Sequence, residues 1–215
     1  MEIPLIRAPT QIPNNVINIF TDGSKIGGKV GAAAVIIKGD IVLHQSKYGL
    51  HERCSNNQAE QVAILKALEH IQNLHLAEDA ENIVLVNTDS KVTLGTLNNR
   101  NKHYMLMEIK RMAIKKLEDQ QWTMVFNWVK AHIGIEGNEM ADRLAKKAST
   151  DNAIELVYNK IPRETIMTEG QKIEMSEWQE QWTSSTKAAV SKLFFPYINE
   201  RIMTVIPISA EFRLW

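Results

Sequence analysis

The chain has 215 residues, with 25 Lys and Arg balanced by 25 Asp and Glu, so its net charge is zero. This length can bury one core of about 150 residues and leave an appended segment. The 44% hydrophobic content is typical of a soluble protein, no apolar run approaches the ~20 residues of a membrane span, and a single cysteine, Cys54, cannot form an internal disulfide. Together with an N-terminus that lacks a secretory signal, these features predict an intracellular protein and no membrane association.

Three strands are predicted at the start of the chain. Residues 16–21 and 30–39 form apolar runs of strand length, and residues 41–50 follow the tight-turn pair Gly39-Asp40. Because the connections are short, we expect an antiparallel meander. Asp22 and Gly23 follow the first of these runs directly, and on local chemistry alone an Asp-Gly pair there favours a hairpin turn.

Helices and strands then alternate along the chain. The pattern predicts helices over residues 55–74, 90–99, 103–120 and 138–150 and strands over residues 82–90 and 122–129. Strands that follow helices favour parallel pairing, so we expect an α/β fold with a five-stranded mixed sheet and helices on both faces. The helix over 103–120 is expected to carry a basic face, made of Lys110, Arg111, Lys115 and Lys116.

Past residue 150 the pattern changes to scattered polar residues, with Pro162 and Gly170 typical of a linker. We expect a mostly helical extension over residues 151–215, with one helix at about 175–195. Because the chain ends on Trp215 without a polar tail, we also expect it to be part of a longer protein.

Four acidic residues stand at positions that a core would not favour. Glu60 shares a helical stripe with apolar residues, where a carboxylate must be solvated, paired or bound to a metal. Asp22 and Asp89 each follow an apolar strand, and Asp142 lies near the start of the last predicted helix of the main domain. Each has an ordinary alternative: a turn for Asp22, a helix cap for Asp89, and a favourable charge near a helix N-terminus for Glu60 and Asp142.

Taken together, the four carboxylates predict a metal site, provided that the two strands carrying Asp22 and Asp89 are neighbours. Oxygen ligands of this kind bind hard divalent cations such as Mg²⁺ or Mn²⁺, and the chain offers no Cys/His set for zinc. Two such ions about 3.5–4 Å apart stabilise the attacking and leaving oxygens in phosphoryl displacement. The expected chemistry is therefore hydrolysis of a phosphodiester.

The motifs "FTDGSK", "NNQAE", "NTDS" and "WVKAHIGIEGNEMADRLAKKA", in this order and spacing, resemble the type-1 ribonuclease H domain. The likeness is greatest to the version found in non-LTR retrotransposon polyproteins of arthropods. It covers residues 14–150, which we expect to form the domain, and implies a ribonuclease H-like fold. The implied activity is endonucleolytic, metal-dependent cleavage of the RNA strand of an RNA/DNA hybrid, leaving 5′-phosphate ends.

The resemblance also assigns roles to residues. It implies that Asp22, Glu60, Asp89 and Asp142 hold two Mg²⁺ ions, for which Mn²⁺ can substitute, and that His132 assists product departure. It further implies that Asn56, Asn57 and Gln58 contact the minor groove of the hybrid and that Arg53 and Ser55 hold a phosphate of the DNA strand. Asn138 matches an asparagine near the metal site. An ordinary reading of the residues around Ser55 is a polar loop that caps the next helix.

The resemblance has one departure and two further implications. Some cellular members carry a separate basic, Trp-containing protrusion, whereas here the basic helix over 103–120 occupies that interval. The tail resembles, more loosely, the region that follows this domain in retrotransposon polyproteins. The expected partners are therefore an RNA/DNA hybrid and, within a polyprotein, a reverse transcriptase and other domains, with the domain itself a monomer in the cytoplasm or nucleus.

Two other functions remain open on the sequence. One is a module that binds a hybrid or duplex without cleaving it, which the intact carboxylates disfavour. The other is an integrase-like nuclease that cuts DNA, which the "NNQAE" segment and the loop around His132 disfavour.

Overall fold

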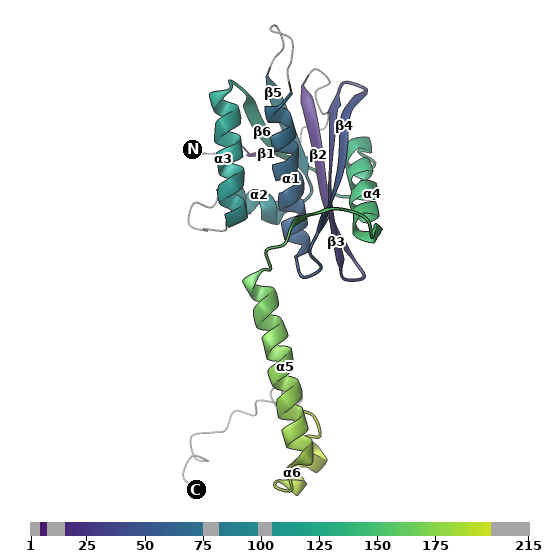
Figure 1. Ribbon diagram of the computed structural model, residues 1–215, viewed down its shortest axis with the longest axis vertical. Helices are drawn as coiled ribbons and strands as arrows, with labels where there is room; N and C mark the ends of the chain where they lie inside the picture. Colours follow the sequence, from purple (N-terminus) through teal and green to yellow (C-terminus); the bar gives the residue numbers. More distant parts are fainter. Residues whose placement is uncertain (1–4, 8–15, 75–81, 99–104, 199–215) are drawn as a thin grey trace. The chain divides into compact units, whose positions relative to one another are not determined.

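The computed structural model describes residues 5–7, 16–74, 82–98 and 105–198, and it divides into two compact units, Met1–Pro162 and Arg163–Trp215 (Figure 1). In the described part of the first unit, the strands are β1 (Leu5–Arg7), β2 (Ile17–Ile26), β3 (Lys29–Lys38), β4 (Ile41–Leu50), β5 (Ile83–Thr88), β6 (Thr123–Trp128) and β7 (Leu156–Tyr158). The helices of this unit are α1 (Asn56–Gln72), α2 (Lys91–Asn98), α3 (Met105–Asp119) and α4 (Glu136–Thr150).

The strands form one mixed sheet in the order β1-β6-β5-β2-β3-β4-β7. The pairs β2/β3 and β3/β4 are antiparallel, which confirms the predicted meander, and β5 and β6 continue the sheet in parallel with β2. The described sheet has seven strands rather than the predicted five, because the three-residue strands β1 and β7 pair in parallel with β6 and β4 at its two edges. Runs this short carry no readable periodicity.

Helices cover both faces of the sheet, as predicted: α1 and α3 lie on one face and α4 on the other (Figure 1). Ile17 and Ile19 of β2 belong to the larger core cluster, beneath α1 and α3. Phe20, of opposite parity on the same strand, packs with Val35 and Ala141 of α4. Because successive side chains of a strand point to opposite faces of the sheet, β2 contributes residues to the core on both faces.

The hairpin between β2 and β3 does not form where the sequence favoured it. β2 continues through Asp22, which lies opposite Ala33, and the chain turns only at Gly27 and Gly28, whose φ angles are 57° and 84°. The expectation of a turn at Asp22 is therefore wrong. The Asp-Gly pattern misled because Gly23 serves a packing role instead: a Cβ there would lie 2.6 Å from the backbone nitrogen of Glu60.

The predicted basic face of α3 is also corrected. Lys110 is fully buried and lies at helical spacing with the buried residues Ala113, Ile114 and Leu117. Because residues three, four and seven positions apart share one face of a helix, Lys110 belongs to the packing stripe and not to the basic surface. The exposed cations of this helix are Lys115 and Lys116, with Arg111 half-buried.

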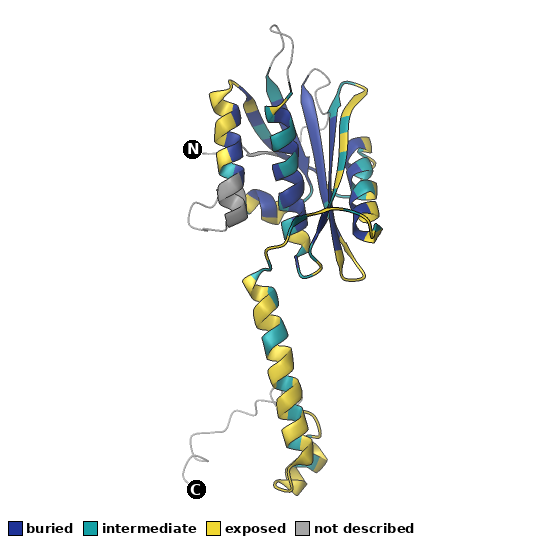
Figure 2. Cartoon of the chain, viewed as in Figure 1, coloured by how far each residue is buried: buried dark blue, intermediate teal, exposed yellow. Residues whose placement is uncertain are grey.

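The second unit contains α5 (Arg163–Ser184) and α6 (Ala189–Phe194), which confirms a helical extension. The single helix predicted at about 175–195 is wrong in its bounds, because two helices cover this stretch and the first begins at Arg163. Gly170 lies inside α5 rather than in a linker, and the helix ends before Ala188, whose φ is 61°. None of the described α5 residues is buried, and Figure 2 shows an almost wholly exposed helix. The prediction failed because α5 lacks the apolar periodicity on which helix bounds are read.

No helix in the described ranges is long and apolar enough to cross a membrane. Four predicted features lie outside the described residues: the domain start at residue 14, the last residue of the helix over 90–99, the first residues of the helix over 103–120, and the end of the tail beyond residue 198.

Candidate active site

Three of the four predicted carboxylates meet in one cluster. Asp22 comes from β2, Glu60 from an early turn of α1, and Asp89 directly follows β5. A carboxylate oxygen of each lies within 4.8 Å of one from each of the others. The sheet accounts for two of them, since the parallel pairing of Thr21 with Thr88 makes the next residues, Asp22 and Asp89, neighbours.

Local contacts fix Glu60 beside Asp22. Ser55 caps α1 through a capping box in which its hydroxyl accepts from the Gln58 N–H and the Gln58 side chain accepts from the Ser55 N–H. The helix then crosses β2 at Gly23, where the missing side chain lets the backbones approach. The backbone of Gly23 lies beside the Glu60 carboxylate and lowers the pKa of that group against the effect of burial.

The alternative role for Asp89, as a helix cap, is taken by its neighbour. The Ser90 hydroxyl accepts a hydrogen bond from the Thr93 N–H at 3.2 Å, so Ser90 caps α2. The indole N–H of Trp128 donates to the Asp89 carbonyl at 3.0 Å. The Asp89 backbone is thus held from β6 while its carboxylate joins the cluster.

The cluster is buried and electrostatically crowded. Asp22 is 8% exposed and Glu60 is 4% exposed. Burial, followed by the negative charges of Asp89 and Asp142, raises the pKa of Asp22 to about 7. Burial and the charges of Asp22 and Asp89 raise the pKa of Glu60 well above its usual value, and burial is the main cause that raises the pKa of Asp89.

These residues fit a divalent cation. The set offers only oxygen ligands, which hard cations such as Mg²⁺ prefer. In the described part of the chain, the buried Oε2 of Glu60 has no hydrogen-bond partner, although buried polar atoms almost always have one. A bound cation would both partner this oxygen and offset the repulsion among the three carboxylates.

Asp142 lies beside the cluster rather than inside it. Its charge raises the pKa of both Asp22 and Asp89, so it is close to each. Its carboxylate forms a 2.8 Å ion pair with Lys146, one turn further along α4. Lys146 is therefore a residue of the site that the sequence reasoning missed, although its spacing of four residues from Asp142 signals the pair.

His132 lies in the exposed loop before α4, with a φ of 55°. It forms a second group with Glu139 and Asp142, in which ligand atoms lie within 4.8 Å of one another. Glu139 was also missed by the sequence reasoning, and the signal was its spacing of three residues from Asp142, which puts both on one helix face.

Asn138 lies at the start of α4 and is 3% exposed. Its side chain lies beside the Asp89 carboxylate and lowers the pKa of that group against the effect of burial. Among the described residues, its own Oδ1 has no partner. Gly137, the residue before it, lets the start of α4 pack closely on β2, because a Cβ at residue 137 would lie 2.3 Å from the ring of Phe20.

Apart from Asn138 on α4, the residues expected to contact nucleic acid gather at the N-terminal end of α1, in the segment from His51 to Gln58, called here the recognition loop. Asn56 and Asn57 are exposed, and Arg53 and Ser55 are half-buried. Gln58 differs from the others because its side chain forms hydrogen bonds within the protein, with the Ser55 N–H and with the Lys160 carbonyl at 2.9 Å. Ser55 and Gln58 thus form the helix cap that the sequence offered as the ordinary role of this loop.

Comparisons with known proteins give a consistent result. A family model described as RNase H matches residues 14–150. Ribonuclease H of Ruthia magnifica is 31% identical over 147 residues, covering 62% of this chain and 95% of the relative. Ribonuclease HI of Synechocystis is 30% identical over 152 residues, covering 64% and 90%.

A solved structure is similar as well. It is the N-terminal RNase H domain of a Mycobacterium tuberculosis protein, determined as a fusion with maltose-binding protein. The TM-score is 0.50 at 25% identity, and the match covers 62% of this chain and 93% of that one. The residues 151–215 lie outside the stretch that the family model matches.

Proposed function

This chain belongs to the RNase H family, in its type-1 form, and from this premise we propose which residues carry out its hydrolysis of the RNA strand of RNA/DNA hybrids. The catalytic residues are Asp22, Glu60, Asp89, Asp142 and His132. The observation that carries the proposal is the cluster of the buried Asp22 and Glu60 with the half-buried Asp89, beside which Asp142 lies. Such a concentration of negative charge is costly unless it serves a site.

The family depends on divalent metal, and we propose two Mg²⁺ ions, replaceable by Mn²⁺, held by Asp22, Glu60, Asp89 and Asp142. Such ions supply activation of a water and stabilisation of the charge that develops on the phosphate oxygens. The protein's part is to hold the ligands. Gly23 fixes the position of Glu60, and Asn138 orients the carboxylate of Asp89.

The residues around Asp142 have a different role. Lys146 pairs with the Asp142 carboxylate and reduces its repulsion with the cluster. His132 is exposed at the mouth of the site, within 4.8 Å of ligand atoms of Asp142, so it is placed to accept or donate a proton as the product leaves.

For substrate binding, we assign Asn56 and Asn57 to the minor groove of the hybrid, where 2′-hydroxyls distinguish RNA from DNA. Their exposure at the start of α1 supports this assignment. Arg53 and Ser55 hold a DNA phosphate, a contact that positions the duplex without reading its sequence. Gln58 and Asn138 support the site through other protein groups: Gln58 bonds to the Lys160 carbonyl, and Asn138 lies beside the Asp89 carboxylate.

The wider setting is also a proposal. We assign residues 14–150 to the catalytic domain and residues 151–215 to an extension, in an intracellular retrotransposon polyprotein that includes a reverse transcriptase. The combination of sequence motifs supports this origin. The relatives reported above are bacterial ribonucleases H, of which this chain covers at least 90%, so they do not bear on the flanking domains.

The experiment is a cleavage assay on a hybrid with a labelled RNA strand, in Mg²⁺ and in Mn²⁺, beside the variant Asp22→Asn. We expect cleavage by the wild type, and a loss of at least about 10³-fold in rate for the variant, because it removes a cation ligand at a cost of about 4 kcal/mol in barrier height. Circular dichroism checks that the variant is folded.

Two outcomes of this assay would contradict the proposal. Folded wild type that leaves the hybrid intact in both metals, but binds it in EDTA, would indicate a binding module. Cleavage of an all-DNA duplex at the same rate as the hybrid would indicate a DNA nuclease of the same fold.

A further inference from the structure

We propose that the segment Asp151–Lys160, called here the flanking segment, positions the recognition loop, so that affinity for the hybrid depends on residues beyond the catalytic domain. This inference rests on the proposed function, because it takes the recognition loop as the substrate contact. Gln58 is the positioning residue that joins the two segments.

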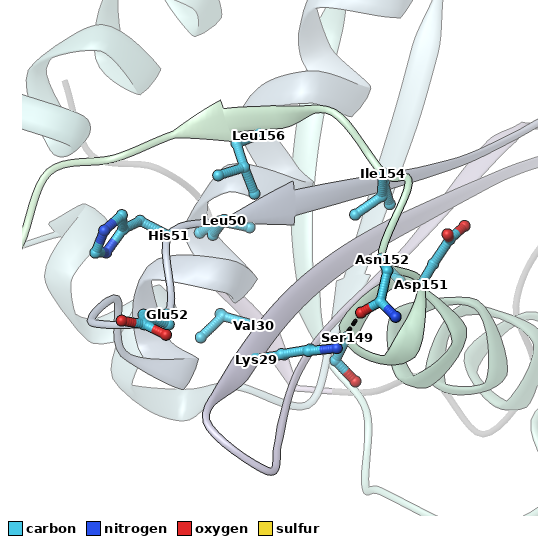
Figure 3. Close-up of a pocket in the computed structure, with 11 residues that line it drawn as sticks. Lys29, Val30, Leu50, His51, Glu52, Ser149, Asp151, Asn152, Ile154 and Leu156 are labelled. Carbon is cyan, nitrogen blue, oxygen red and sulfur yellow. Dashed lines mark hydrogen bonds between the residues drawn. The ribbon is translucent and has the colours of Figure 1, made fainter.

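The flanking segment is fastened to the sheet at its start. Asp151 forms a 2.7 Å ion pair with Lys47 of β4, and the side chain of Asn152 accepts a hydrogen bond from Lys29 of β3 (Figure 3). Both ion-pair partners are partly exposed, so this contact alone contributes little. Together with the Asn152 bond, the ion pair holds the chain that leaves α4 close to the edge of the sheet.

Contacts with β4 then hold the segment at the edge of the sheet. Ile154, which is half-buried, and Leu156, which is 57% exposed, line a cavity of about 450 Å³ with Val30 and Leu50, and Figure 3 shows both side chains on the sheet side of the segment. The fit depends on Gly49: a Cβ there would lie 2.7 Å from Cγ2 of Ile154 and 3.1 Å from the Glu155 carbonyl oxygen. The backbone N–H of Gly49 donates to that same carbonyl at 3.1 Å.

The far end of the segment holds the recognition loop. The backbone N–H of His51 donates to the Tyr158 carbonyl at 2.9 Å. The Lys160 carbonyl accepts from the side chain of Gln58 at 2.9 Å and from the thiol of Cys54 at 3.6 Å. The first, middle and last parts of the loop are thus hydrogen-bonded to the flanking segment, at Tyr158 of β7 and at Lys160 just beyond it.

A contact from the other side completes the arrangement. The Nζ of Lys25 on β2 donates to the Cys54 carbonyl at 2.8 Å. The recognition loop therefore lies between the β2 hairpin and the flanking segment, with bonds to both. Because a loop that is ordered before binding does not lose conformational freedom on binding, these bonds favour affinity for the hybrid rather than the chemical step.

The test uses the full chain and the variant Gly49→Val, which displaces the flanking segment without changing the recognition loop or a carboxylate. We expect KM for the hybrid to rise about 5- to 20-fold, with kcat within about twofold. Gln45→Val is the matched control, since Gln45 is an exposed residue of the same strand, and its KM should stay at the wild-type value.

A double-variant cycle links the effect to the loop. If Gly49→Val acts by releasing the phosphate contact of Arg53, then it should raise KM much less in an Arg53→Ala background than in the wild type. The slope of log KM against log salt should also fall by about one in Gly49→Val, as expected for one lost phosphate contact. A purely structural effect would lower the melting temperature and leave this slope unchanged.

The outcomes separate the two proposals. Failure of the wild type to cleave the hybrid contradicts the proposed function itself. Wild-type cleavage together with an unchanged KM and salt slope in Gly49→Val overturns the positioning role alone. If Gly49→Val does not fold, the double variant Ile154→Gly/Leu156→Gly, which removes the same packing from the segment's side, decides by the same two readouts.

Discussion

Two buried ionisable groups of opposite sign stand out among the individual residues. Asp22 lies with neighbouring carboxylates in an acidic cluster to which we assign the divalent cations, and this assignment accounts for its burial. Lys110 is fully buried, and among the described residues its Nζ has no hydrogen-bond partner. Both groups therefore lower the stability of the folded protein over a definable range of pH.

For Asp22, the folded-state pKa of about 7 lies above the ordinary value of 3.8. Between these pH values the folded protein binds more protons than the unfolded chain, so stability falls as pH rises. In EDTA at pH 7.5, Asp22→Asn should be more stable than the wild type, by on the order of 2 kcal/mol, with a gain that fades toward pH 4. Urea unfolding across pH measures this, and a gain that does not vary with pH would contradict it.

For Lys110, burial lowers the pKa to about 7, and the nearby Arg111 adds to this. The unfolded chain then binds more protons above pH 7, so wild-type stability should rise from pH 7 to pH 10. Lys110→Met should remove this rise and stabilise the protein at pH 7 by about 1–3 kcal/mol. The control is Lys115→Met, at an exposed position on the same helix, with an expected change within about 0.5 kcal/mol.

These residues also mark what the sequence could predict about the site. The four carboxylates could be selected because each interrupts an apolar pattern at a strand end or helix start. Lys110 was misassigned because the charges of its neighbours suggested a basic face, although its spacing from Ile114 and Leu117 placed it on the buried stripe. The contacts of Gln58 with Lys160 join residues far apart in sequence, so no local pattern could reveal them.

At the scale of elements, the site depends on how closely α1 crosses β2. Gly23 permits this approach, since its neighbours across the contact are the backbone nitrogen of Glu60 and the Cβ of Ala59. Neither atom can move without shifting the helix. The absence of a side chain at Gly23 therefore sets the position of the first turns of α1. These turns carry Glu60 and the end of the recognition loop.

Gly23→Ala should consequently reduce both stability and activity. We expect a loss of about 1–3 kcal/mol in the free energy of unfolding, as for other overpacked contacts, and a fall in kcat because Glu60 is displaced. Gly95→Ala is the matched control, because among the described residues no neighbour outside its own helix lies within 4 Å of a Cβ at that position, and it should be neutral or slightly stabilising. Thermal unfolding and the hybrid assay measure both effects, and equal results for the two variants would refute the packing role.

Most elements were predictable because they bury one face. The meander, α1 and α4 carry the expected periodicities, and the predicted fold is confirmed. The exceptions share a physical cause: β1 and β7 have three residues each, and α5 has no buried residue among those described. Where an element buries little, hydrophobic patterning carries little information about it.

For the whole molecule, cation binding and folding should be coupled, because the four carboxylates come from β2, α1, α4 and the end of β5 and meet only in the folded state. Mg²⁺ should raise the melting temperature, with a stabilisation of about 2.7 kcal/mol at a concentration 100 times the dissociation constant. Asp22→Asn should largely lose this shift, whereas Asp119→Asn, at an exposed carboxylate on α3, should keep it. Equal shifts in both variants would show that the ion binds elsewhere.

The two edges of the sheet have a consequence for behaviour at high concentration. An exposed edge strand offers unpaired N–H and C=O groups to which another chain can add, and long, flat edges promote aggregation. Here the described sheet ends on β1 and β7, each three residues long. Such short edges are poor templates for a further strand, and residues outside the matched domain thereby protect its β4 and β6 from intermolecular pairing.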